Sequence, residues 1–144
     1  MPLPDLTPDI TTQFKDAGLV AADAAWQTGG ANFIHDLGSA TFTPMAMHIK
    51  VSEIEIASND ELYRLVVQGS SSPTFASAFA SLGELTLGAN EVLLGDVDSV
   101  TGEYVIYFHN DVGGTLYQYI RGFTKFAGAV ATGINHQAWM TAIP

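Results

Sequence analysis

The sequence predicts an all-β protein, an antiparallel β-sandwich or jelly roll with an extended N-terminal arm. Apolar and polar residues alternate in short stretches, such as residues 63–67 and 104–108, and this period is typical of strands. Clusters of Gly, Ser, Asn and Asp separate the stretches at a spacing typical of sandwiches. No long helical pattern lies between them, which argues against an α/β fold.

Length and composition predict one domain that folds without covalent staples. The chain has 144 residues, enough to bury a core of its own. It has no cysteine, which excludes disulfides and thiolate metal sites. The longest apolar runs are too short for a transmembrane helix. The N-terminus lacks the basic and apolar regions of a signal peptide. We therefore expect no membrane partner, and a protein that is made and kept, or assembled, in a cytoplasm.

The charge balance disfavours nucleic acid as a partner. Fifteen acidic residues outnumber five basic ones, giving a net charge of −10, and the basic residues are scattered. Neutralising phosphates requires clustered Lys and Arg. The apolar fraction is 47%, which indicates either a large core or a surface that is buried in an oligomer or larger assembly.

Residues 1–30 are predicted to form the arm, and residues 31–144 a single sandwich domain. Pro2, Pro4 and Pro8 favour extended backbone, and the segment shows little alternation. Phe14 and Trp26 have no strand to belong to, so they either cover an open end of the sandwich or anchor the arm on a neighbour. The residues of the arm that we expect to bind a partner are Leu3, Leu6, Phe14 and Trp26.

The predicted strands follow in chain order. We expect about eight, including residues 32–37, 45–56, 62–68, 84–87, 103–109, 115–126 and 134–142. Ile49 and Val51 lie on the opposite face from Ile54 and Ile56, which predicts a β-bulge or a switch of sheets. Residues 103–109 are apolar on both faces, so that strand is predicted to be central. Residues 74–94 stay ambiguous, because part of the segment has helical spacing and part of it alternates.

No catalytic constellation emerges, so we expect no enzyme, no cofactor and no metal. The histidines lack the spacing of metal ligands along a helix or strand; they are His35, His48, His109 and His136. Asp96 and Asp98 are interpreted as an acidic turn, with weak calcium binding as the alternative. Glu53 and Glu55 lie on one strand face, about 7 Å apart. Exposed alternation explains that pair better than glycoside hydrolysis does.

Aromatic and arginine side chains predict a contact surface. Tyr117 and Tyr119 are expected to share one strand face with Arg121 and Phe123. Such a surface suits a protein interface or a sugar platform, although ordinary core packing also accounts for most of this stripe. Outside the arm, the residues expected to bind a partner are Phe75, Phe79, Tyr117, Tyr119 and Arg121.

A family resemblance runs through nearly the whole chain. The segments that carry it are Phe14-Lys15-Asp16-Ala17, Ile34-His35-Asp36-Leu37-Gly38, Ile49-Lys50-Val51-Ser52-Glu53, Leu65-Val66-Val67-Gln68-Gly69-Ser70 with Ser72-Pro73, and Tyr117-Gln118-Tyr119-Ile120-Arg121. Their order resembles that of tailed-bacteriophage capsid cement, or decoration, proteins with a jelly-roll fold. The chain departs from this pattern in its apolar residues 74–94 and in Gly122, which replaces a bulky residue.

The resemblance implies a structural protein on the capsid exterior of a virion. Its partners would be the major capsid protein, whose neighbouring subunits it bridges, and itself, as a dimer or trimer. We assign the clamp to residues 1–30 and to the loop at 70–82. The alternative from another class is a carbohydrate-binding β-sandwich module at a virion or cell surface. Its candidate residues are Tyr117, Tyr119 and Trp139.

Overall fold

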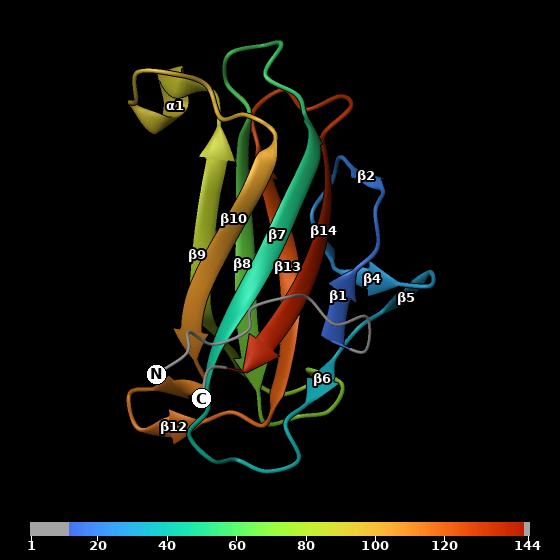
Figure 1. Ribbon diagram of the computed structural model, residues 1–144, viewed down its shortest axis with the longest axis vertical. Helices are drawn as coiled ribbons and strands as arrows, with labels where there is room; N and C mark the ends of the chain where they lie inside the picture. Colours follow the sequence, from blue (N-terminus) through green and yellow to red (C-terminus); the bar gives the residue numbers. More distant parts are fainter. Residues whose placement is uncertain (1–11, 143–144) are drawn as a thin grey trace, which may run out of the picture.

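Two antiparallel sheets pack face to face in the computed structural model, which describes residues 12–142 (Figure 1). The predicted all-β sandwich is therefore confirmed. Sheet A has the order β1-β14-β7-β10, and β2 also pairs with β14. Its strands are β1 (Gln13–Lys15), β2 (Leu19–Val20), β7 (Pro44–Ile54), β10 (Gly102–His109) and β14 (Ile134–Ala142).

Sheet B has the order β3-β13-β8-β9, and β6 also pairs with β13. Its strands are β3 (Ala24–Ala25), β6 (His35–Asp36), β8 (Leu62–Ser70), β9 (Phe79–Gly88) and β13 (Tyr119–Ala127). Two small hairpins and one helical turn complete the described structure. They are β4 (Gln27–Thr28) with β5 (Ala31–Asn32), β11 (Asp111–Val112) with β12 (Thr115–Leu116), and α1 (Asn90–Leu93).

The order of the strands is that of a jelly roll. Counting β1 and β2 as one edge strand, and leaving out the minor strands, the chain order is β1/β2, β3, β7, β8, β9, β10, β13, β14. On this count sheet A reads 1-8-3-6 and sheet B reads 2-7-4-5. The segment before residue 30 thus supplies the first strand of each sheet. We name the side formed by β1, β2 and β3 the closed flank, and the side formed by β9 and β10 the open flank.

The closed flank replaces the expected arm over the residues that the structure describes. β1 and β2 pair with β14, and β3 pairs with β13. These strands are two or three residues long, so they carry no readable alternation. The prolines that suggested an arm, together with Leu3 and Leu6, lie outside the described residues.

The core between the sheets follows the predicted alternation. Tyr63, Leu65 and Val67 of β8 are fully buried on the inner face. The predicted break in β7 is a β-bulge: Asn135 faces Glu53, whereas His136 faces Val51. Ser52 is therefore an extra residue, and it restores Ile54 to the side of the core.

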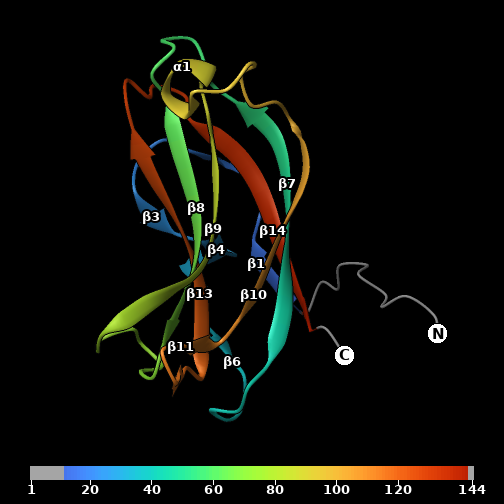
Figure 2. The same cartoon turned by 90° about the vertical axis from the view of Figure 1, so that its left-hand side faces the viewer.

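Other strand predictions need correction. The strand expected to be central, at residues 103–109, is β10 and lies at an edge of sheet A. The long strand expected at 115–126 is divided into β12 and β13, because Tyr117 turns the chain by donating its N–H to the carbonyl of Asn110 (2.9 Å). The ambiguous residues 74–94 contain β9 and then α1. Figure 2 shows the sheets edge-on, with β9 and β10 toward the viewer.

Candidate interaction surfaces

Phe14 and Trp26 close one side of the sandwich from within. Phe14 is fully buried, and its ring meets the edge of Phe33 with centroids 4.9 Å apart. Trp26 is 1% exposed and lies edge-on to the ring of His136 at 5.2 Å. Of the two alternatives for these aromatics, covering the sandwich is correct. Neither side chain is exposed to a partner, so the clamp assigned to residues 1–30 does not include them.

The indole of Trp26 explains why residue 122 is a glycine. The Trp26 N–H donates to the Gly122 carbonyl (2.9 Å), and its indole Nε1 donates to Thr124 Oγ1 (2.7 Å). A Cβ at position 122 would overlap the six-membered ring of the indole. Gly122 therefore has a local cause, since the Trp26 indole, from the residue between β3 and β4, fills the space that a side chain at position 122 would need.

Lys15 is the least expected feature of the closed flank. Its Nζ donates to the carbonyls of Asp16 (3.0 Å), Gly18 (3.2 Å) and His136 (2.9 Å). Burial lowers the pKa of this amine to about 8, and the charge of Asp16 offsets part of that effect. The ammonium group thereby ties the turn after β1 to β14, and all its donors have acceptors.

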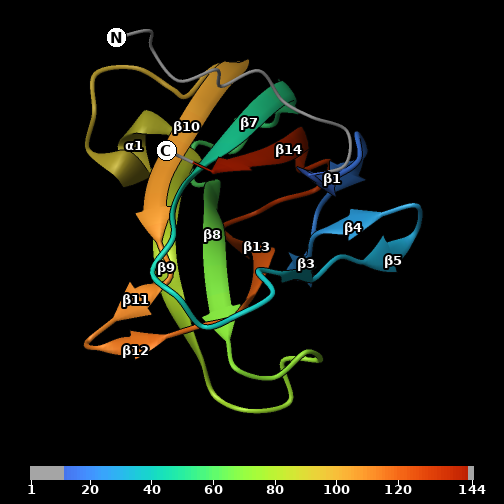
Figure 3. The same ribbon diagram turned by 60° about the horizontal axis from the view of Figure 1, so that its bottom comes forward.

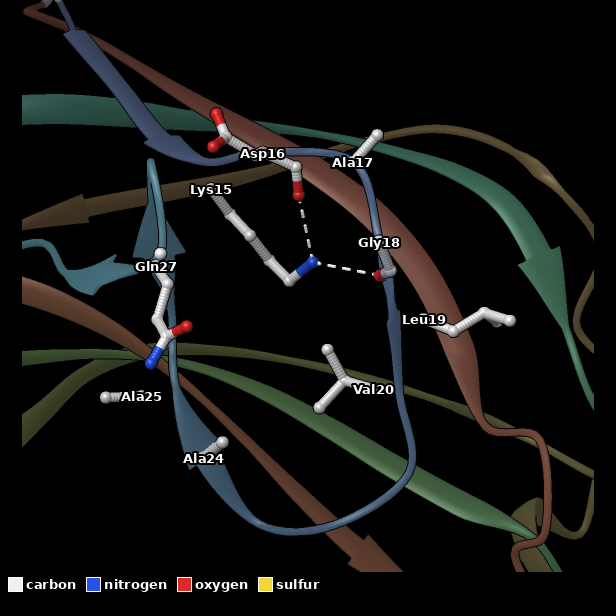
Figure 4. Close-up of a pocket in the computed structure, with 10 residues that line it drawn as sticks. Lys15, Asp16, Ala17, Gly18, Leu19, Val20, Ala24, Ala25 and Gln27 are labelled. Carbon is white, nitrogen blue, oxygen red and sulfur yellow. Dashed lines mark hydrogen bonds between the residues drawn. The ribbon is translucent and has the colours of Figure 1, made fainter.

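A hollow of about 400 Å³ opens beside this lysine (Figure 4). Figure 4 shows Lys15 crossing it below the 16–18 turn, with Val20, Ala24 and Ala25 on the lower side. The Asp16 carboxylate accepts from the N–H of Gly29 (2.6 Å). The polar groups of this wall are therefore engaged in holding the flank together.

His136 is fully buried beneath the same flank. Its Nε2 is hydrogen-bonded to Thr124 Oγ1 (3.2 Å), while its Nδ1 has no hydrogen-bond partner. Burial, and then the charge of Lys15, lower the pKa of His136 well below its ordinary value. Within residues 12–142, no group of three or more His, Cys, Asp or Glu side chains is placed to hold a metal ion.

The predicted contact residues outside the arm are partly brought together on the outer face of sheet B. The Arg121 guanidinium lies over the rings of Phe75 (4.3 Å), Phe79 (5.2 Å) and Phe123 (5.6 Å). Its Nε donates to Gln68 Oε1 (2.8 Å). We name these four residues, Phe75, Phe79, Arg121 and Phe123, the arginine–phenylalanine patch. Phe79 is 50% exposed and Phe75 is buried.

Local hydrogen bonds shape the loop that carries Phe75. Ser72 Oγ accepts from the N–H groups of Thr74 (3.3 Å) and Ala76 (3.2 Å), and Ser70 Oγ accepts from the N–H of Ser72 (3.1 Å). Phe75 has a φ of 54°, in the left-handed region. Such backbone is costly for a bulky residue, so the contact with Arg121 holds this ring in place. Figure 3 shows the loop projecting past the ends of β8 and β9.

The aromatics expected to form a sugar platform do not meet. Tyr119 is on β13 next to the arginine–phenylalanine patch, whereas the Cβ of Tyr117 lies 3.0 Å from where a Cβ on Gly69 would be, on the inner face. Trp139 is on β14 of the other sheet. It borders a hollow of about 170 Å³ on the outer face of sheet A, together with His48, Ile49, Lys50, Glu103, Tyr104 and Val105.

Two of the acidic residues singled out in the sequence, Glu55 and Asp98, have structural partners. Asp98 Oδ1 accepts from the N–H of Asn90 (2.9 Å). The Glu55 carboxylate accepts from the N–H groups of Ala131 (2.7 Å) and Thr132 (2.8 Å), and these bonds lower its pKa. Each carboxylate thus fixes a loop at the end of the sandwich. Close to Asp98, Leu94 is 91% exposed.

Fold and surface together define a jelly-roll domain with the arginine–phenylalanine patch on the outer face of sheet B. The chain matches no protein-family model, and it matches none of the curated proteins. In the part of the chain that the structure describes, no helix is both long and apolar enough to span a membrane.

Proposed function

We propose that this protein is a non-catalytic virion component of a tailed bacteriophage. It binds the outer surface of the assembled capsid and cements neighbouring subunits of the major capsid protein. The proposal is supported by the ordered sequence resemblance and by the jelly-roll fold. The observation that carries it furthest is the arginine–phenylalanine patch on the outer face of sheet B.

The patch has the properties of a protein-binding hot spot. Aromatic and arginine side chains dominate the binding energy of protein interfaces. Phe79 leaves half of its side chain in water, and burying it against a partner would remove that apolar surface. Gln68 and Phe75 hold Arg121 in one place, so little side-chain entropy is lost on binding. A matching capsid surface would offer an apolar pocket to Phe79 and a carboxylate to Arg121.

The energetics of cementing suit such a modest patch. A ligand that binds the assembled shell better than free subunits stabilises the shell. Each clamp that contacts two subunits also gains from the high effective concentration of its second contact. The loop at 70–82 carries two rings of the patch, so it stays within the proposed clamp. Residues 13–28 leave the clamp, because they belong to the sandwich.

A co-sedimentation experiment tests the proposal. Purified protein is mixed with expanded capsids that lack it, and bound copies per shell are counted. We expect saturation at a fixed copy number and a higher melting temperature of the shell. Phe79→Ala and Arg121→Ala should weaken binding at least about tenfold. Phe42→Ala is the matched control, because Phe42 is also an exposed ring but lies outside the patch. Absence of co-sedimentation by the wild-type protein would refute cementing.

The carbohydrate-binding alternative now depends on Trp139 alone. The hollow beside it combines an indole with His48, Lys50 and Glu103, and aromatic rings with polar neighbours are suited to sugars. A glycan array with the free protein tests this alternative. Binding that Trp139→Ala abolishes, while Tyr119→Ala does not, would favour it over cementing.

A further inference from the structure

The outer edge of β10 is unusual for a strand at the side of a sheet. The strand runs for eight residues and pairs with β7 in an uninterrupted register. Apart from β7, no strand of residues 12–142 pairs with it. Figure 2 looks onto this side of the molecule. Unpaired N–H and C=O groups along such an edge are a template for another strand.

The other sheet edges are blunted. β9 has an extra residue at Leu82, because Gly83 faces Val67 whereas Ser81 faces Gln68. On the closed flank, β14 is covered by the short strands β1 and β2, and β13 by β3 and β6. Bulges and very short strands are the usual devices against edge-to-edge pairing. β10 has neither.

The side chains of β10 also favour pairing. Residues 102–109 include no Lys, Arg or Pro, the residues that commonly protect an edge. On the outer face, Val105 is 40% and Tyr107 is 65% exposed. The residues of β10 are those of a central strand, which has a neighbour on each side, whereas the fold gives β10 only one neighbour. A strand added at its free edge would supply the second neighbour.

We propose that a second copy of the chain pairs antiparallel with β10 about a two-fold axis, which joins two copies of sheet A into one continuous sheet. Residues with the same hydrogen-bonding direction face each other in an antiparallel pair. A two-fold axis must therefore lie between two copies of the same residue, so that this residue faces its own copy. The interface is isologous and closes on itself, so it stops at a dimer.

Charge and shape place the axis at Ile106. In that register Glu103 faces His109 of the second copy, and Val105 faces Tyr107 of the second copy. An acid then faces an imidazole and an aliphatic side chain faces a ring, both favourable cross-strand pairs. An axis at Val105 would instead place Glu103 against Tyr107 and leave His109 unpaired. The inference does not rest on the capsid proposal, because the free protein would pair.

Sedimentation of the free protein over a concentration series tests the proposal. We expect a monomer–dimer equilibrium for the wild type. The double variant V105K/Y107K should be monomeric, because each lysine would face another lysine across the axis. The control L94K/V97K adds the same charge at exposed apolar positions outside β10, and it should still form dimers. Thermal melting checks that both variants fold.

A charge exchange tests the register. His109→Glu should weaken the dimer several-fold by facing Glu103, and E103K/H109E should restore it. A wild-type monomer at all concentrations overturns the proposal, as does a V105K/Y107K dimer. If the wild type is monomeric and V105K/Y107K loses only capsid binding, the edge pairs with a capsid strand instead of a second copy. If the free protein forms dimers that do not bind capsids, the cementing proposal is refuted and the pairing through β10 stands.

Discussion

The closed and open flanks of the sandwich differ in how far their apolar side chains are buried. On the closed flank, Phe14 and Trp26 are buried within the chain itself, and Lys15 is held by main-chain carbonyls. On the open flank, Val105 and Tyr107 stay in contact with water. We infer that one flank stabilises the fold while the other is free for association. Changes on the closed flank should alter the free energy of unfolding, and changes on the open flank should alter assembly.

The largest effect is expected from Trp26→Ala on the closed flank. The change removes an indole that is 1% exposed, together with its bond to Thr124, and should lower the free energy of unfolding by about 3–5 kcal/mol. Urea unfolding measures it. Trp139→Ala is the control, because that ring lies on an outer face and should matter less. Equal losses in the two variants would show that burying Trp26 in the closed flank stabilises the fold no more than a ring on an outer face does.

Gly122→Ala should come next. Its methyl group would enter the space of the Trp26 indole, which should cost about 1–3 kcal/mol of unfolding free energy. Gly18→Ala is the matched control, because no atom lies within 4 Å of a Cβ there. In W26A/G122A the indole is gone, so the double loss should be smaller than the sum. Strict additivity would mean that the two residues do not interact.

Acid should weaken the closed flank through His136. Its folded pKa lies well below 6.5, so below that pH the unfolded chain binds a proton that the folded chain does not. The free energy of unfolding should therefore fall as the pH drops below about 6.5, by up to about 1.4 kcal/mol per pH unit. Urea unfolding between pH 7 and pH 5 measures the slope. His136→Gln should reduce this slope, and the part that remains comes from His35 and His48, whose pKa values burial also lowers.

The smallest effect is expected outside both flanks, at Leu94 in the loop after α1. This residue has a φ of 59° and a side chain that is 91% exposed. Glycine adopts such backbone without strain, so Leu94→Gly should raise the free energy of unfolding by about 0.5–1 kcal/mol. Val97→Gly, at a position without positive φ, should lower it slightly. A stability loss at Leu94 would show that its side chain contributes packing.

The sequence predicts those strand faces and breaks that follow from regular alternation of apolar and polar residues. The inner face of β8 and the break in β7 could be read directly, because each strand is long enough to show its period. The closed flank could not be predicted, since strands of two or three residues have no period. The burial of Lys15 depends on a carbonyl that is 121 positions away, and no local pattern signals such a partner.

The arginine–phenylalanine patch could also be predicted only in part from local sequence patterns. Phe75, Phe79 and Arg121 were predicted to bind a partner; the structure brings them together, and their binding to a partner stays a prediction. Tyr117 was wrongly placed on their strand, because one main-chain bond to Asn110 turns the chain before β13. The edge position of β10 follows from topology, which the composition of a single strand does not contain.

The buried amine of Lys15 gives the protein an internal reporter for chemical footprinting. Lys50 and Lys125 are exposed, so an acylating reagent should modify them at the rate of a free amine. Lys15 should react only when the 13–20 segment detaches from β14, because its amine is buried in the folded protein; detachment removes the burial that lowers its pKa, so the exposed amine should then react like an ordinary lysine. The ratio of the two rates, read by mass spectrometry, measures how often this side of the protein opens.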